Sequence, residues 1–265
     1  MRIFVFLVSG GAFPIQLGLL SELTLNHNIK PHLSLGSSGG NIASYICHAS
    51  NWKEDKMLQI INLLSPDMFA ASWWPRYLTF MPSWMIGYFK GSLYACGSGS
   101  EILFHKMFTS DSICSTELWT GTLNRDTGKG QFFCNRQEKD SIIKPSNDTS
   151  INLFSRDCMP LTYMNGDLDY ISKVTMASAS IPVLVPEQII NDQKYVDGGT
   201  LFASPLTGLQ DSILDLISDG KESLHIDYFS SFDMQINSGS SGSGTIYDNS
   251  TLSVGELIKS MCIQD

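Results

Sequence analysis

Two units of strand, glycine turn and helix follow one another in the first fifty residues, and this succession constrains the fold more than any other feature. An apolar run at 3–8 ends in Ser-Gly-Gly, and apolar residues at helical spacing follow at 14–27. A second run at 31–35 ends in Gly-Ser-Ser-Gly-Gly, and a helix is predicted from Gly39. Two such units favour an α/β fold with a parallel sheet, in which both strands end at one edge, where sites form.

Composition excludes several classes of protein. A chain of 265 residues can bury a large core, and 43% hydrophobic against 16% charged residues describes a globular protein. The net charge of -9, with no local Lys/Arg cluster, would repel a phosphate backbone, so no nucleic-acid partner is expected. The six cysteines have neither CxxC pairs nor metal-ligand spacing with the five histidines, so we expect buried thiols and no metal.

The first twenty residues also resemble a signal peptide, with Arg2 as its basic start. The apolar run at 3–8 is short for that purpose, and the helical spacing after Gly11 favours a strand followed by a helix. We therefore expect a cytoplasmic protein whose contact with membranes is peripheral and transient.

An aromatic-rich, nearly uncharged stretch occupies residues 69–94. Pro75, Arg76 and Pro82 interrupt it, so it is not expected to span a bilayer. Two interpretations stay open: a buried helical insertion, and an apolar cap or interfacial surface. Further along, residues 117–135 predict two strands joined by a polar turn at 126–130.

Residues 36–40, GSSGG, are the only G-x-S-x-G pattern in the chain. A serine nucleophile must be exposed, held in position, given a base and faced by oxyanion donors. Gly36 and Gly40 lack the Cβ atoms that would collide in a sharp strand-to-helix turn. The N-terminal end of the helix from Gly39 would favour a developing negative charge near Ser38. The alternative is an ordinary turn of small residues, such as the similar GSSGSG at 239–244.

The earlier glycine turn supplies candidate donors for an oxyanion hole. It would lie at the same sheet edge as Ser38, and the backbone N–H groups of Gly10, Gly11 and Ala12 could point at a developing negative charge. A plain turn between strand and helix is the alternative.

The base is harder to identify from the residues. Ser38, Asp197 and His225 occur in the order of an α/β-hydrolase triad, but that fold places several strands before its nucleophile, and here one precedes the strand leading to Ser38. The triad is therefore not favoured. Core or surface roles are expected for the other histidines, His27, His32, His48 and His105.

Taken together, three ordered blocks resemble the patatin-like phospholipase family. The first is Ser-Gly-Gly-Ala at 9–12, similar to the family's glycine-rich oxyanion loop, and the second is the GSSGG motif. The third is the small-residue segment at 177–182, ASASIP, followed by Tyr-Val-Asp-Gly-Gly at 195–199. The stretch at 123–133, LNRDTGKGQFF, also resembles the family's mid-domain hairpin, and the resemblance extends from residue 1 to about 210.

The resemblance implies a three-layer α/β/α fold with a largely parallel central sheet and helices on both faces. It also implies a Ser-Asp dyad, with Ser38 as nucleophile and Asp197 as base, and with Gly198 and Gly199 completing the D-G-G motif. No histidine and no cofactor is then needed. We expect one domain over 1–265, with 69–94 as insertion or cap and a poorly matched part at 211–265 that contains the Gly/Ser-rich loop.

The implied function is a serine lipid acyl hydrolase of phospholipase A or lipase type, acting on acyl esters of phospholipids or other lipids. The loop departs from the family pattern, because it is one glycine short and has Phe13 and Pro14 near the place of a basic residue. Two alternatives therefore stay open: a catalytically impaired scaffold that binds lipid or a protein partner, and an acyltransferase.

Overall fold

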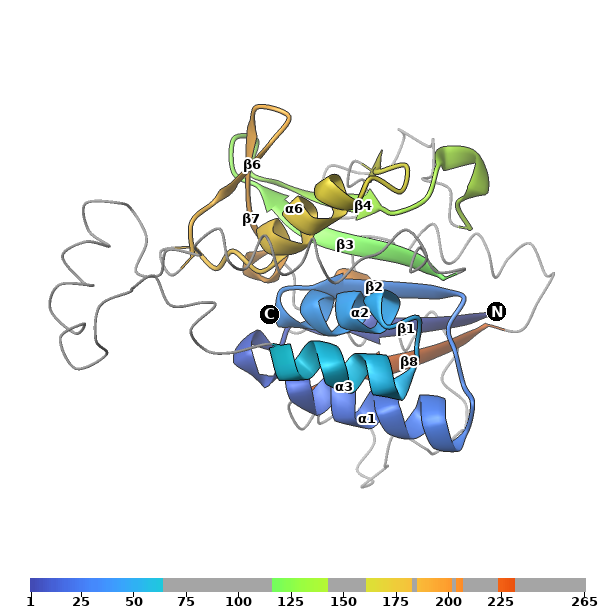
Figure 1. Cartoon of the computed structure of the whole chain (residues 1–265). Helices are drawn as coiled ribbons and strands as arrows, with labels where there is room; N and C mark the ends of the chain where they lie inside the picture. The colour runs from blue at the N-terminus through green and yellow to red at the C-terminus, as the bar shows by residue number, and fades with distance from the viewer. Residues whose placement is uncertain (64–115, 143–160, 183–184, 202–203, 207–223, 232–265) are drawn as a thin grey trace, which may run out of the picture.

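The computed structural model describes residues 1–63, 116–142, 161–182, 185–201, 204–206 and 224–231 (Figure 1). In this part of the chain the strands form one sheet in the order β5-β4-β3-β2-β1-β8, and β7, paired with β6, joins it at β3. The strands are β1 (Arg2–Phe6), β2 (Leu33–Ser37), β3 (Glu117–Asn124), β4 (Lys129–Cys134), β5 (Leu161–Tyr163), β6 (Gln188–Ile190), β7 (Gln193–Asp197) and β8 (His225–Phe229). The helices are α1 (Phe13–Asn26), α2 (Gly39–Ala49), α3 (Glu54–Leu63), α6 (Leu168–Ser178) and the 3-10 turns η1 (Gly10–Ala12), η5 (Glu138–Asp140) and η6 (Gly198–Thr200).

The two predicted strand–helix units are confirmed. β1 and β2 pair in parallel, with Ile3 opposite Leu33 and Phe6 opposite Gly36. β8 and β3 continue the parallel arrangement on either side of this pair. Antiparallel pairing occurs where β3 meets β4 and β7, and between β6 and β7. The central sheet is thus mostly parallel and packed against helices, as predicted for the α/β fold.

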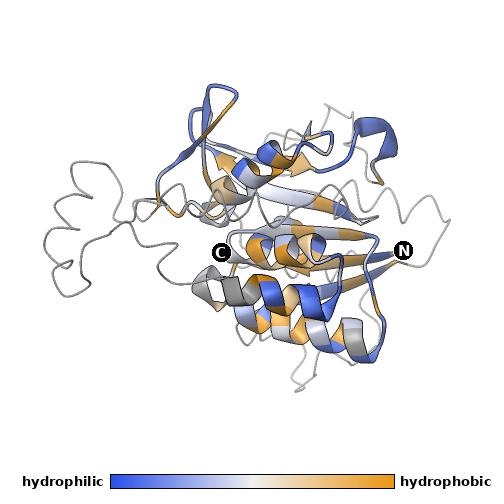
Figure 2. Ribbon diagram, viewed as in Figure 1, coloured by the Kyte–Doolittle hydropathy of each residue, from blue (hydrophilic) through white to orange (hydrophobic). Residues whose placement is uncertain are grey.

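Both faces of the sheet are buried. Helices α1, α2, α3 and α6 lie together on one face (Figure 1), where Phe4 and Phe6 of β1 join their hydrophobic cluster. The alternate residues Ile3 and Val5 point to the opposite face and pack in a second cluster with Trp119. Figure 2 shows hydrophobic residues on α2 and hydrophilic ones at the tip of the β6–β7 hairpin. Side chains buried on both sides are the pattern expected for the middle layer of three.

Small and polar residues allow α2 to approach β2 closely. Ser34 Oγ lies 2.8 Å from Ser44 Oγ and 2.7 Å from His48 Nε2, and all three side chains are buried. Burial lowers the pKa of His48 to about 3, so its imidazole is neutral. His48 therefore has a core role, joining the helix to the strand beneath it.

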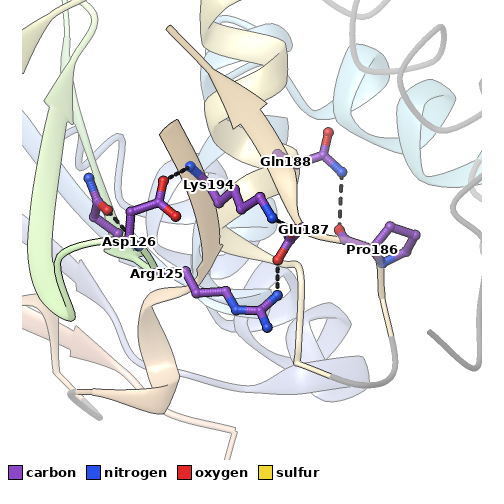
Figure 3. A network of polar contacts seen from close by, with 7 residues as sticks. Arg125, Asp126, Pro186, Glu187, Gln188 and Lys194 are labelled. Carbon is purple, nitrogen blue, oxygen red and sulfur yellow. Dashed lines mark hydrogen bonds and ion pairs between the residues drawn. The ribbon is translucent and has the colours of Figure 1, made fainter. Parts of the chain in front are cut away.

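The predicted hairpin at 117–135 is confirmed as β3 and β4, and its turn anchors a second hairpin, β6–β7. Glu187 forms ion pairs with Arg125 and, at 3.0 Å, with Lys194, while the Lys194 N–H donates to Asp126 at 2.8 Å (Figure 3). Arg125 N–H also donates to the Lys194 carbonyl at 2.8 Å. These contacts hold β7 against the end of β3.

Among the described helices and strands, α3, β5, α6, β6 and β8 were not predicted from the sequence. Helix α6 begins after Asp167, whose side chain accepts from the Tyr170 N–H, and it buries Ile171 and Val174 against the sheet. Strand β8 comes from the poorly matched C-terminal part, yet it pairs along the full length of β1. Residues 69–94, His105 and the Gly/Ser-rich loop lie outside the described residues.

Replacing Gly40 by alanine should lower the free energy of unfolding by about 2 kcal/mol or more. A Cβ there would lie 2.3 Å from the Leu7 carbonyl oxygen and 2.6 Å from that of Phe6, both backbone atoms that cannot move aside. Gly18→Ala on the exposed side of α1 is the matched control, because a Cβ there meets nothing within 4 Å. It should raise the free energy of unfolding by about 0.5–1 kcal/mol. Urea denaturation compares the two, and equal effects would contradict this packing.

Candidate active site

The strand pairing brings Ser38 and Asp197 to the same place. β2 pairs with β3 as far as Ser37, which lies opposite Gly121, and then leaves the sheet at Ser38. From Thr122 onward that side of β3 is taken by β7, which runs antiparallel and ends with Asp197 opposite Thr122. The last residue of β7 therefore stops at the turn where β2 gives way to α2.

Ser38 has an unusual backbone conformation. Its φ of 57° and ψ of -138° are strained for a residue with a side chain, and such strain costs about 1–3 kcal/mol. Its carbonyl accepts from the N–H groups of Asn41 and Ile42, at 3.0 and 3.3 Å, which fixes the start of α2. Ser38 is thus the single residue between the end of β2 and the start of α2.

The glycines of the turn are required by backbone packing. A Cβ on Gly36 would lie 2.6 Å from Asn41 Cα, and Gly40 is packed against the end of β1 as described above. A Cβ on Gly39 would lie 2.1 Å from the Gly10 carbonyl oxygen, so residues 9–12 rest on the first turn of α2. The two glycine-rich turns are therefore neighbours at one sheet edge.

A short hydrogen bond joins the two candidate catalytic residues. Ser38 Oγ donates to Asp197 Oδ2 at 2.7 Å, and the Gly199 N–H donates to Oδ1 at 2.7 Å. Asp197 is 2% exposed, and burial raises its pKa from 3.8 to about 6, although the bonds from Ser38 and Gly199 lower it. The carboxyl group is thus a stronger base than an exposed aspartate and is still ionised at neutral pH.

The D-G-G motif places its glycines against this pair. A Cβ on Gly198 would lie 2.6 Å from the Gly121 carbonyl oxygen, and one on Gly199 would lie 2.7 Å from Val8 Cγ1. The same added Cβ on Gly199 would lie 3.4 Å from Ser38 Cβ. Only residues without side chains leave room there for the Ser38–Asp197 contact.

The turn at 9–12 contains the three candidate oxyanion donors, and they are not equivalent. Gly10 has a φ of 51°, which favours glycine. The Ala12 N–H donates to the Ser9 carbonyl at 2.9 Å, so this donor is already used within the turn, and Gly10 and Gly11 are the better candidates.

Gln16 anchors the chain on either side of this turn. Its buried Nε2 donates to the carbonyls of Leu7 and Phe229, at 2.9 and 2.8 Å, and so joins α1 to the ends of β1 and β8. Ser231 Oγ adds a bond of 3.0 Å to the Ala12 carbonyl. These side chains were not singled out from the sequence, because their partners are backbone atoms distant along the chain.

His225 lies at the other end of the sheet. It opens β8 and pairs with Arg2, whereas Phe229 at the end of β8 pairs with Phe6 near the candidate site. Since Ser38 follows the C-terminal end of β2, the length of the parallel strands separates the two residues. The Ser-Asp-His arrangement is therefore not assembled.

A comparison with protein-family models matches residues 8–209 to the patatin-like phospholipase model. The chain belongs to the patatin-like phospholipase family. Membership implies lipid acyl hydrolase activity and a lipid substrate. A search of curated proteins found no match.

Among the described residues, no group of three or more His, Cys, Asp or Glu side chains could hold a metal ion. In the same part of the chain, no helix is long and apolar enough to cross a bilayer.

The raised pKa of Asp197 predicts a pH-dependent stability. Between about pH 4 and 6 the folded state keeps a proton that the unfolded state has released, so the free energy of unfolding falls as pH rises through this window. Relative to Asp197→Asn, which cannot ionise, the parent should lose about 2–3 kcal/mol between pH 4 and 7. Urea denaturation of both proteins at the two pH values measures this difference. An equal pH response of the two would mean that Asp197 is solvated.

Proposed function

We propose that this protein is a serine lipid acyl hydrolase of phospholipase A or lipase type, with Ser38 as nucleophile and Asp197 as general base. The observation that carries the proposal is the 2.7 Å hydrogen bond from Ser38 Oγ to the buried Asp197 carboxylate, formed at a strained turn between strand and helix. A hydroxyl held in this way, with a base already accepting its proton, is the arrangement that activates a weak nucleophile.

The proposed reaction has two halves. Ser38 Oγ attacks the ester carbonyl carbon as its proton passes to Asp197 Oδ2, and the tetrahedral intermediate collapses when the leaving alcohol takes that proton. Water then gives a proton to Asp197 and attacks the acyl-enzyme, and the carboxylic acid leaves as Ser38 recovers its proton. One residue thus acts as base and then as acid in each half.

Burial of Asp197 explains how a carboxylate could serve without histidine. An aspartate with an ordinary pKa near 3.8 holds a proton too weakly to remove one from a serine efficiently at neutral pH. The raised value of about 6 brings it into the range of a histidine. The carboxylate has no ion-pair partner among the described residues, which preserves this basicity.

The oxyanion is best stabilised by backbone groups in this arrangement. The donors that we propose are the N–H groups of Gly10 and Gly11, with the N-terminal end of α2 adding its dipole beside Ser38. Backbone donors need no basic side chain, so the presence of Phe13 and Pro14 after the turn is compatible with turnover.

Removal of the nucleophile should abolish turnover. Ser38→Ala should lower kcat/KM on a nitrophenyl acyl ester and on a phospholipid by at least about 1000-fold, and it should abolish labelling by a fluorophosphonate. Asp197→Asn should lower kcat/KM by at least about 100-fold, because it removes the base. Ser21→Ala, at the surface of α1, is the control and should retain parent activity.

Mass spectrometry of the labelled parent locates the adduct. A Ser38 adduct with ester release supports hydrolysis, and product analysis with added alcohol or lysolipid separates hydrolysis from acyl transfer. A folded parent that is never labelled would instead support a lipid- or partner-binding scaffold.

On the acidic side of the pH profile, kcat/KM should follow the ionisation of a single group, Asp197. With Asp197 as base, kcat/KM should fall about tenfold per pH unit below pH 6, because protonated Asp197 cannot accept the Ser38 proton. Initial rates between pH 4 and 8 test this. If kcat/KM fell only below about pH 3.8, the pKa of an exposed aspartate, this result would argue against a buried base.

A further inference from the structure

The hydroxyl group of Ser178 makes two hydrogen bonds beside the candidate nucleophile. Ser178 is the last residue of α6 and is fully buried. Its Oγ accepts from the Ser38 N–H at 3.1 Å and donates to the Gly121 carbonyl at 2.7 Å. One side chain thus connects the strained turn of residues 36–40 to β3, across 140 residues of sequence on one side and 57 on the other.

Residues 178–180, at the end of α6 and directly after it, also bind the backbone of Asp197. The Ser180 carbonyl accepts from the Asp197 N–H at 3.0 Å, so residues 178–180 bind the backbone amides of both Ser38 and Asp197. Ser180 is itself fixed, because its Oγ donates to the Met176 carbonyl at 2.8 Å. Because this segment accepts hydrogen bonds from both amides, it constrains the distance between the Ser38 and Asp197 side chains.

We infer that residues 178–180 are the template that positions the Ser38–Asp197 pair, and that the Ser178 hydroxyl is a positioning residue for the reaction. The inference rests on the proposed function. Ser38 φ sets the direction of the Cα–Cβ bond, from which Oγ extends, relative to the preceding peptide, and its positive value is strained unless contacts hold that peptide. The bond to Ser178 holds the peptide from the nitrogen side, while Asn41 and Ile42 hold it from the carbonyl side.

A second consequence concerns the oxyanion hole. Because the Ser38 N–H donates to Ser178, it is not available to a substrate. The donors must therefore come from other backbone groups, which agrees with the choice of Gly10 and Gly11 above. Ser178 thus has two proposed effects, since it helps to orient the attacking residue and it occupies one amide, that of Ser38, that could otherwise face the oxyanion.

The test compares Ser178→Ala with Ser172→Ala. Ser172 is on the same helix, is buried, and has its Oγ 3.2 Å from the Tyr45 hydroxyl, so its removal also deletes a buried hydrogen bond of α6. Ser178→Ala should lower kcat and the rate of Ser38 phosphonylation at least about tenfold with KM within about twofold, because misorientation affects attack more than binding. Ser172→Ala should stay within about twofold of the parent in all three.

Parent-like phosphonylation of Ser178→Ala, with the parent itself labelled, overturns the inference and leaves the proposed function intact. A tenfold loss in Ser172→Ala also overturns it, since any buried bond of α6 would then have the same effect. A parent that is never labelled overturns the proposed function, and the catalytic role of Ser178 with it.

Two further measurements guard against a variant that does not fold. Ser178→Cys fills the same space with a weaker hydrogen-bonding group and should also slow phosphonylation. Hydrogen exchange of the Ser38 amide, followed by NMR, should accelerate in Ser178→Ala and stay unchanged in Ser172→Ala. An unchanged Ser38 exchange rate in Ser178→Ala overturns the inference whatever the activity.

Discussion

Gly121 of β3 lies opposite Ser37 of β2, and the next residue, Thr122, lies opposite Asp197 of β7. This exchange of partners along one side of β3 is the constraint on which the site depends. β2 can leave the sheet as a sharp turn because β7 arrives to satisfy the backbone groups of β3 that β2 no longer pairs with. The same geometry places two residues separated by 159 positions in the sequence within hydrogen-bonding distance.

The site combines features that each reduce stability, and its surroundings compensate for them. Ser38 is held at a positive φ, and Asp197 is a buried carboxylate without an ion-pair partner among the described residues. Both are tolerated because the neighbouring backbone is fixed by the sheet, by α2 and by the segment 178–180. The hydrogen bonds from Ser38 and Gly199 replace part of the hydration that the carboxylate loses. The raised pKa of Asp197 is the consequence of that incomplete compensation, and under the proposed function it makes Asp197 a stronger base.

Local patterns predicted the parts of the fold that depend on neighbours in sequence. Helix α2, the strands before it and the β3–β4 hairpin are each determined by glycine turns and apolar runs of a few residues. Asp197, by contrast, was assigned from the resemblance, because Asp-Gly-Gly alone fits many turns.

The elements and contacts that were missed depend on distant partners. The signal for α6 was present, since Asp167 caps a segment with Leu168, Ile171 and Val174 at helical spacing. Strand β8 is only five residues long, and its place beside β1 cannot be inferred from its own sequence. The two hydrogen bonds of Ser178 were equally hidden, because a serine near a helix end gives no sign of its partners in the sequence.

Contacts between residues distant in the sequence also surround the turn at 9–12, which has Phe13 and Pro14 after it in place of the family's usual basic residue. Pro14 falls in the first turn of α1, where a missing N–H is tolerated, so this substitution does not disturb the helix. Gln16, one helical turn into α1, ties the ends of β1 and β8 together, and Ser231 holds the Ala12 carbonyl. Gly39 has no side chain and lets the Gly10 carbonyl rest on α2. Under the proposed function, these neutral groups around the turn take the place of a basic residue in holding its backbone donors near the oxyanion.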